Sequence, residues 1–331
     1  MSQQRQAFDA VRQAVCLLAV FATTLASIAW GIDPARAQDG SWPDTLVIGT
    51  ALRGGTYDAY GRGLAALLGD KVRIGAATRE TNGPEENLDL LRVGKIQIGF
   101  TTLGAALRML KQQPQGTDNI RALAPMYETA FHFVVASQSP AKAIRDLEGK
   151  SIGVGPRGGT AAFYVPLMMK ALGINAQFVE GDWETLNNKL ASSSIDLLAV
   201  AGGTPFPALL DLGKRQQIRF IPLNRDDALK IQLQVPELAR TRVPLGVYPW
   251  EQTVYPTMGL FNFIAVRSDL PDSLAAAVIE ALFSDNATML EFSPAAAETL
   301  PSNYARNSIL PFHSGVMRWY QHHPSFADHG D

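Results

Sequence analysis

Residues 49–56 read GTALRGGT and residues 153–160 read GVGPRGGT, so one short pattern of arginine, two glycines and threonine occurs twice. Each copy follows a β-rich run and precedes residues with helical spacing. The first turn of a helix offers unpaired N–H groups and the positive end of the helix dipole, and glycine lets a ligand approach the backbone closely. The repeat therefore predicts two anion-binding turns that face one cleft.

The arginines of these turns, Arg53 and Arg157, are candidate partners for a carboxylate, although either could point to solvent. A nucleotide-binding P-loop needs lysine where Gly55 and Gly159 stand, so neither turn predicts a nucleoside triphosphate site. One glycine turn alone would only join a strand to a helix. Two matching turns are more informative than one.

The rest of the chain alternates short apolar runs with longer amphipathic stretches, which is typical of an α/β fold. Two long apolar runs, residues 123–136 and 257–266, are long enough to cross between two lobes. They predict a continuous second lobe, residues 136–257, inserted into a discontinuous first lobe made of residues 38–135 and 258–331. Residues after 320 are polar and histidine-rich, and we expect them to be loosely ordered.

The N-terminus has the pattern of a secretory signal peptide. Arg5 and Arg12 precede an uncharged run at residues 14–32, and residues 35–37 read ARA, a cleavage pattern. We expect residues 1–37 to be removed, the remaining protein to be periplasmic and soluble, and an uncleaved membrane anchor to be the alternative. Removal takes with it Cys16, the one cysteine of the chain, which leaves neither disulfides nor thiolate chemistry.

Composition excludes several function classes. The chain has 331 residues with 29 basic and 31 acidic side chains, and this balance does not predict the basic face that nucleic-acid binding needs. Four of the five histidines lie in the last 19 residues, where adjacent His322 and His323 would point apart, so no metal site is predicted. His132 and Trp183 are more simply explained by packing. No serine nucleophile elbow occurs, and we expect neither catalytic residues nor a cofactor.

The order of short motifs along the chain resembles the TAXI-type solute-binding proteins of tripartite ATP-independent periplasmic (TRAP) transporters, over nearly all of the mature chain. The motifs include TNGPEEN at residues 81–87, DLEGK at 146–150, AGGTPFPA at 201–208, GVYP at 246–249 and LPFHSG at 310–315. This resemblance implies a type II periplasmic-binding-protein fold, in which two α/β lobes on a two-crossing hinge close over a small organic anion. It also implies delivery of that anion to the transporter's membrane subunits, separate or fused, without ATP.

Candidate ligand-binding residues come partly from the glycine turns and partly from the resemblance. The turns contribute Arg53, Gly54, Gly55, Thr56, Arg157, Gly158, Gly159 and Thr160. The resemblance adds Tyr57 directly after the first turn, Asn87 on the following helix, the loop residues Gly203, Thr204, Pro205 and Phe206, and Tyr248.

The sequence departs from the resembling family in ways that bear on the ligand. Arg53 and Arg157 stand where small or hydroxyl residues are common, and residues 101–104, TTLG, replace a polar stretch. A dicarboxylate or a 2-oxo acid is therefore favoured over an acidic amino acid, whose ammonium group would need a polar acceptor. A periplasmic enzyme acting on a small acid through Thr56 or Thr160 remains an alternative, as does a ligand-sensing partner of a membrane receptor. We expect the protein to be a monomer.

Overall fold

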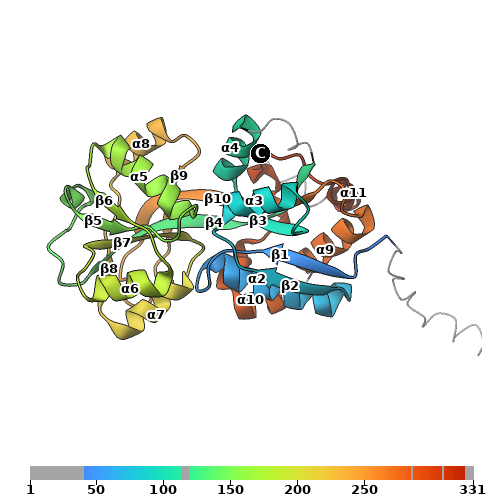
Figure 1. Cartoon of the computed structure of the whole chain (residues 1–331), viewed down its shortest axis with the longest axis horizontal. Coiled ribbons are helices and arrows are strands. Elements are labelled where there is room, and N and C mark those ends of the chain that lie inside the picture. Colours follow the sequence, from blue (N-terminus) through green and yellow to red (C-terminus); the bar gives the residue numbers. More distant parts are fainter. Residues whose placement is uncertain (1–40, 113–118, 285, 308, 325–331) are drawn as a thin grey trace, which may run out of the picture. The chain divides into compact units, whose positions relative to one another are not determined.

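The computed structural model describes residues 41–112, 119–284, 286–307 and 309–324 (Figure 1). In these ranges the chain forms one mixed sheet of ten strands. The strands are β1 (Thr45–Gly49), β2 (Gly75–Arg79), β3 (Ile98–Thr102), β4 (Ile120–Ala136), β5 (Ser151–Gly153), β6 (Gln177–Val179), β7 (Leu197–Gly202), β8 (Ile218–Phe220), β9 (Ala239–Val243) and β10 (Tyr255–Arg267).

Strands β4 and β10 hold the two ends of the sheet together. The strand order is β2-β1-β3-β10-β4-β7-β5-β6, with β8 paired to β4 and β9 to β10. The outer pairs are parallel, whereas every pair that involves β4 or β10 is antiparallel. β4 and β10 correspond to the two predicted crossing runs, so the expected α/β architecture of two lobes on two crossings is confirmed. We call the half around β1–β3 the first lobe and the half around β5–β8 the second lobe.

Helices cover both lobes (Figure 1). Those beside β1–β3 are α2, α3, α4, α9, α10 and α11, and those beside β5–β8 are α5 to α8. Their bounds are α2 (Thr56–Leu67), α3 (Pro84–Arg92), α4 (Leu103–Gln112), α5 (Thr160–Leu172), α6 (Trp183–Ala191), α7 (Pro207–Arg215), α8 (Arg225–Gln234), α9 (Asp272–Ser284), α10 (Ala287–Phe292) and α11 (Ser314–His322). A π-helical turn (Leu68–Val72) and three 3₁₀ turns (Ile144–Leu147, Pro294–Glu298, Pro301–Arg306) complete the helical elements of the described ranges.

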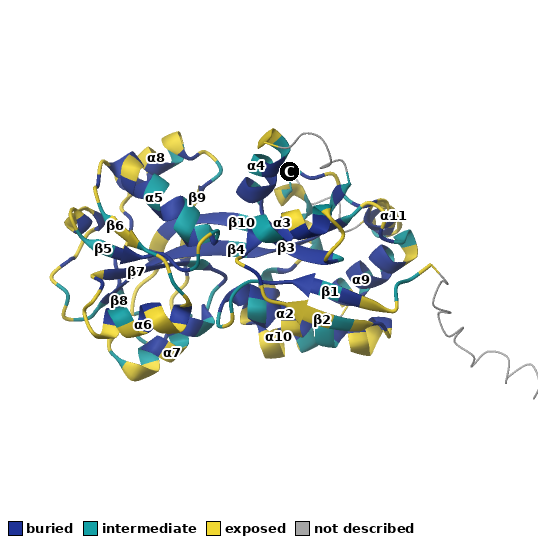
Figure 2. Ribbon diagram, in the orientation of Figure 1, coloured by how far each residue is buried: buried dark blue, intermediate teal, exposed yellow. Residues whose placement is uncertain are grey.

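The core follows the central strands (Figure 2). Fourteen of the 17 residues of β4 are buried, because helices cover both faces of the strand and leave it without a solvent side. β2 at the edge of the sheet is mostly exposed, and its five residues include one alanine pair and an arginine rather than an apolar run. Helices of both lobes turn an exposed face outward, as amphipathic sequences require (Figure 2).

Local sequence predicts many of these elements. The sequence predicts strands at residues 45–49 and 177–179 and helices at 183–191 and 287–292, and β1, β6, α6 and α10 have these bounds. It also predicts helices at residues 57–68, 161–172 and 274–283, and α2, α5 and α9 differ from these by one or two residues at their ends. Elements β2, α4, α8 and β9 were not predicted. Helix α11 continues to His322, beyond the point where loose order was expected, and residues 325–331 lie outside the described ranges.

The predicted signal peptide at residues 1–37, including Cys16, also lies outside the described residues. Within the described ranges, none of the helices combines the length and apolar character needed to cross a membrane.

Candidate functional site

A cavity of about 50 Å³ lies where the N-termini of α2, α3 and α5 meet. On the scale where one water molecule needs roughly 10–15 Å³, this space suits a small compact ligand. Its described lining residues are all uncharged: Ala51, Leu52, Gly55, Thr56, Tyr57, Asn82, Gly83, Pro84, Tyr127, Thr129, Val154, Pro156, Gly159, Thr160, Ala161, Trp183, Ala201, Gly202 and Phe206.

The two glycine turns have nearly the same backbone. Gly54 and Gly158 have φ angles of 84° and 78°, which favour glycine, and the next residues, Gly55 and Gly159, are the N-caps of α2 and α5. The Gly55 N–H donates to Leu52 O at 3.2 Å, and the Gly159 N–H donates to Pro156 O at 3.0 Å. A glycine N-cap has no side chain to accept from the first helical turn, so the first-turn N–H groups are left available to a ligand.

The three helix N-termini differ in the charge that they carry themselves. Helix α2 has Asp58 in its first turn, and α3 has Glu85 and Glu86. Helix α5 has no acidic residue in its first turn. A carboxylate already placed at a helix N-terminus offsets the helix dipole, so the N-terminus of α5 is the most attractive of the three for an anion.

The hydroxyl groups of the lining residues differ in burial and in hydrogen bonding. Thr56 is buried and its hydroxyl donates to Gly203 O at 3.3 Å, while the Tyr57 hydroxyl donates to Asn262 Oδ1 at 2.8 Å. Thr160 is half-buried at the cavity. These contacts leave Thr56 and Tyr57 to offer mainly their backbone N–H groups to a ligand.

Tyr127 on β4 lines the cavity, and its side chain is fully buried. Its hydroxyl oxygen has no hydrogen-bond partner among the described residues. Burial and the nearby Tyr57, Tyr60 and Glu298 raise the pKa of Tyr127 well above its usual value, and the neighbouring Thr56 hydroxyl acts weakly in the opposite direction. The phenol therefore stays protonated, and a ligand that accepts its hydrogen bond would relieve the cost of an unpaired buried group.

Tyr248 lies behind the cavity wall and does not line it. The Phe206 N–H donates to its hydroxyl at 2.8 Å, and this hydroxyl shares a hydrogen bond with Nε2 of His132 at 3.0 Å. Burial lowers the pKa of His132 to about 3, so the ring is neutral. Tyr248 thus holds the wall residue Phe206 rather than reaching a ligand itself.

Neither predicted arginine lines the cavity. Arg157 is 88% exposed and pairs with Glu180 at 3.0 Å. Arg53 is exposed and, together with Gly54, lines a separate outer groove. The structure therefore does not bring the two arginines together at this cavity.

Asn87 is fully buried but does not line the cavity. Its amide donates to Thr50 O at 2.8 Å and to Phe100 O at 2.9 Å, and it accepts from the Thr81 hydroxyl at 2.9 Å. The side chain therefore ties α3 to β1 and β3. Its role in this arrangement is to position the cavity rim.

The loop at residues 203–206 contributes one predicted residue to the cavity. Phe206 lines it, whereas Gly203, Thr204 and Pro205 lie outside the lining. Gly158 is likewise outside, and the lining includes Gly55, Thr56, Tyr57, Gly159 and Thr160 from the predicted set.

Sequence reasoning missed several lining residues. Trp183, interpreted as a packing residue, lines the cavity and meets Phe206 edge-on with ring centroids 5.1 Å apart. Asn82, Gly83 and Pro84 lie in a motif that was noted but not assigned to the cleft. A proline directly after a glycine marks the start of a helix, and this signal could have placed a third helix N-terminus at the site.

The described ranges contain no group of three histidine, cysteine or acidic side chains that could hold a metal ion. His322 and His323 bond the main-chain oxygens of Arg318 and Trp319 in α11.

Comparison with known proteins identifies the family: the NMT1-like family matches residues 48–323, so the chain belongs to it. Solved structures share its type II periplasmic-binding-protein fold at low identity. MatC from Rhodopseudomonas palustris, solved with bound malate, is 13% identical with a TM-score of 0.54, covering 86% of this chain and 98% of MatC. The periplasmic binding protein BugD is 14% identical with a TM-score of 0.54, covering 87% and 97%. A protein from Bordetella bronchiseptica RB50 is 13% identical with a TM-score of 0.53, covering 85% and 98%.

Proposed function

We propose that this member of the NMT1-like family is a periplasmic solute-binding protein that captures a small organic anion in the cavity between its lobes. One observation carries the proposal: the N-terminus of α5 opens into an uncharged cavity, capped by Gly159 and without an acidic residue in its first turn. Backbone N–H groups at a helix N-terminus, aided by the dipole, are suited to a carboxylate. Hydrogen bonds to a charged ligand are each worth about 1.5–3 kcal/mol, so a few give micromolar binding.

The preferred ligand is a dicarboxylate or a 2-oxo acid rather than an acidic amino acid. The unpaired Tyr127 hydroxyl supplies a second donor, which suits a ligand with a second acceptor group. The described lining residues include neither Asp nor Glu to pair with an ammonium group. The malate bound to MatC, a protein of the same fold, agrees with this class of ligand.

The bound anion would be delivered to the membrane subunits of a TRAP-type transporter, with the protein acting as a TAXI-type binding protein. Delivery to the transporter rests on the sequence motifs, and cleavage of residues 1–37 rests on the N-terminal sequence pattern. The protein is further proposed to be a monomer. The proposed lobe boundaries are residues 38–135 plus 258–331 and residues 136–257. β4 and β10, which run through both lobes, are the proposed hinge.

Binding is favoured over catalysis by the residues at the cavity. The Thr56 hydroxyl donates to a main-chain oxygen, and the described lining residues include no carboxylate or imidazole that could act as a base for either threonine. The solved neighbours MatC and BugD are similar in fold, and BugD is described as a periplasmic binding protein.

The test is a thermal-shift screen of the purified, ligand-stripped protein. The panel holds C4 to C6 dicarboxylates, 2-oxo acids, acidic amino acids, glutamine and inorganic anions. A ligand at 100 times its dissociation constant adds about 2.7 kcal/mol of stability. We expect a dicarboxylate or a 2-oxo acid to stabilise the protein and to be recovered unchanged.

Other outcomes of the screen would favour a different ligand or a different function. Stabilisation by an acidic amino acid alone would contradict the ligand class, and conversion of the compound would favour an enzyme. A protein that binds an acid but supports no uptake in cells would favour the sensing role. The absence of any stabilising acid would contradict anion binding at α5.

A further inference from the structure

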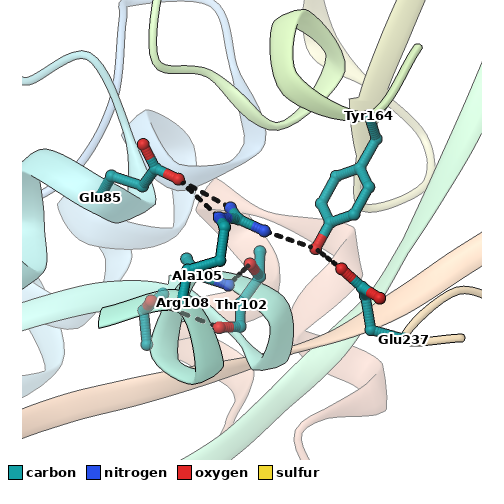
Figure 3. A network of polar contacts seen from close by, with 7 residues as sticks. Glu85, Thr102, Ala105, Arg108, Tyr164 and Glu237 are labelled. Atoms are coloured by element: carbon teal, nitrogen blue, oxygen red, sulfur yellow. Dashed lines mark hydrogen bonds and ion pairs between the residues drawn. The ribbon is translucent and has the colours of Figure 1, made fainter. Parts of the chain in front are cut away.

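A polar network joins the two lobes beside the cavity (Figure 3). Its centre is Arg108 on α4 of the first lobe. The Arg108 guanidinium donates to Oε1 of Glu85 on α3 from Nε at 2.9 Å and from Nη2 at 2.7 Å. Two bonds to one carboxylate oxygen fix the plane of the guanidinium, so its remaining nitrogen points in a defined direction.

That remaining nitrogen reaches the second lobe. Nη1 of Arg108 donates to the hydroxyl of Tyr164 on α5 at 3.1 Å, and this hydroxyl donates to Oε1 of Glu237 at 3.4 Å (Figure 3). The guanidinium carbon also lies 3.6 Å from the centre of the Phe163 ring. Arg108 therefore makes a charge-assisted hydrogen bond and a cation–π contact across the boundary between the lobes.

Close packing accompanies these polar contacts. A β-carbon added to Gly104 on α4 would overlap the hydroxyl oxygen of Tyr164. The Tyr164 hydroxyl of the second lobe therefore packs directly against Gly104 of the first lobe. A side chain at residue 104 would be tolerated by α4 itself, because alanine is a better helix residue than glycine.

The network and the cavity share two helices. Pro84 lines the cavity and is followed by Glu85, while Thr160 and Ala161 line it one turn before Tyr164. Any movement that separates α3 from α5 would open the cavity and break the network together. We propose that Arg108 and Tyr164 are positioning residues that hold α3 and α5 together in the closed arrangement of the lobes. That this contact helps to retain a ligand rests on the proposed function. That it holds the two lobes together does not depend on any ligand.

The chain offers a direct way to measure closure without a ligand. An ideal β-carbon at Gly158 would lie 3.7 Å from the β-carbon of Asn82, across the cavity rim. This separation suits a disulfide, whose β-carbons are about 3.8 Å apart. The parent protein for the test carries Asn82→Cys and Gly158→Cys, with the native Cys16 replaced by serine. Cysteine at residue 158 strains the turn because Gly158 has a φ of 78°, so every variant is compared only with this parent, which carries the same strain. The rate of disulfide formation in ligand-free protein then reports how often residues 82 and 158 approach each other.

Three further substitutions, combined in four variants of this parent, test the network. Gly104→Ala should slow cross-linking at least tenfold, because its methyl group occupies the place of the Tyr164 hydroxyl. Tyr164→Phe should slow it two- to fivefold. The double variant Gly104→Ala/Tyr164→Phe should cross-link faster than Gly104→Ala alone, because the overlapping hydroxyl is gone. Gly69→Ala is the matched control, since a β-carbon there meets no atom within 4 Å, and it should leave the rate unchanged.

Unfolding free energies are measured for every variant, so a folding defect is distinguished from an effect on closure. Cross-linking of Gly104→Ala at the parent rate would overturn the proposal. So would a double variant no faster than Gly104→Ala. Because no ligand is used, failure of anion binding in the thermal-shift screen would leave this result standing.

Discussion

The two glycine turns have the same backbone but different surroundings. Both place a positive-φ glycine before a glycine N-cap, and both leave the first helical turn without a side-chain cap. Around the first turn, Asp58 lies in α2 and the Thr56 hydroxyl is bonded to Gly203 O. Around the second turn, α5 has no acidic residue in its first turn and Thr160 is half-buried at the cavity.

The sequence repeat is therefore a repeat of backbone conformation rather than of function. A turn of this kind supplies donors, but a nearby carboxylate or an occupied hydroxyl reduces what those donors offer to a ligand. We therefore assign the ligand's carboxylate to the turn that begins α5, and a supporting and mainly structural role to the turn that begins α2.

Gly159→Asp should weaken binding of the stabilising acid about 100-fold, which corresponds to about 2.7 kcal/mol. An aspartate at the N-cap accepts from the first-turn N–H groups, so it competes with the ligand for them and repels it. Titration calorimetry measures the change. Gly159→Ala is the steric control, because its β-carbon meets the same Pro156 atoms without the charge. Equal losses of affinity in the two variants would show that steric crowding, rather than competition for the first-turn N–H groups, weakens binding.

The same substitution in the first turn measures how much the N-terminus of α2 contributes to binding. Gly55→Asp should cost less affinity than Gly159→Asp, because the N-terminus of α2 already has Asp58 beside it. A larger loss at Gly55 would reverse the assignment of the two turns.

Thr160→Val should weaken binding about tenfold and leave the free energy of unfolding unchanged. Thr56→Val should instead destabilise the protein by about 1 kcal/mol, because it removes the buried hydrogen bond to Gly203 O. Valine has nearly the shape of threonine, so packing is preserved in both variants. Chemical denaturation and calorimetry together separate the two effects, and the reverse pattern would contradict the account.

Tyr127→Phe should weaken binding about fivefold for a ligand with two acceptor groups and less for a monocarboxylate. The hydroxyl has no partner among the described residues, so its removal should not lower the stability of the ligand-free protein. Affinities for a dicarboxylate and its monocarboxylate analogue provide the measurement. Equal losses for the two acids would argue against a specific bond from Tyr127 to the second acceptor.

Arg157→Gln should change affinity less than twofold. The side chain is mostly exposed, pairs with Glu180 and does not line the cavity. Exposed ion pairs contribute little to stability, so the protein should unfold as before. A tenfold loss of affinity would show that Arg157 reaches the ligand after all.

The sequence predicts those elements whose conformation is determined by residues close together in the chain. The glycine turns, the helices after them and the two crossing strands follow from local spacing and apolar character. β2 escaped prediction because it is a mostly exposed edge strand without an apolar run. Asn87 and Tyr248 were assigned to the ligand, but their polar atoms bond the backbone of distant strands and loops. Tyr127 was overlooked because an apolar run does not reveal which of its aromatic side chains lacks a polar partner.

A crystal structure of the protein with the acid that stabilises it most would show directly which turn binds the ligand's carboxylate. We expect one carboxylate within hydrogen-bond distance of the backbone nitrogens of Thr160 and Ala161, and a second acceptor group near the Tyr127 hydroxyl. A carboxylate bound instead at Arg53 in the outer groove, or at the N-terminus of α2 with α5 left unoccupied, would contradict this expectation.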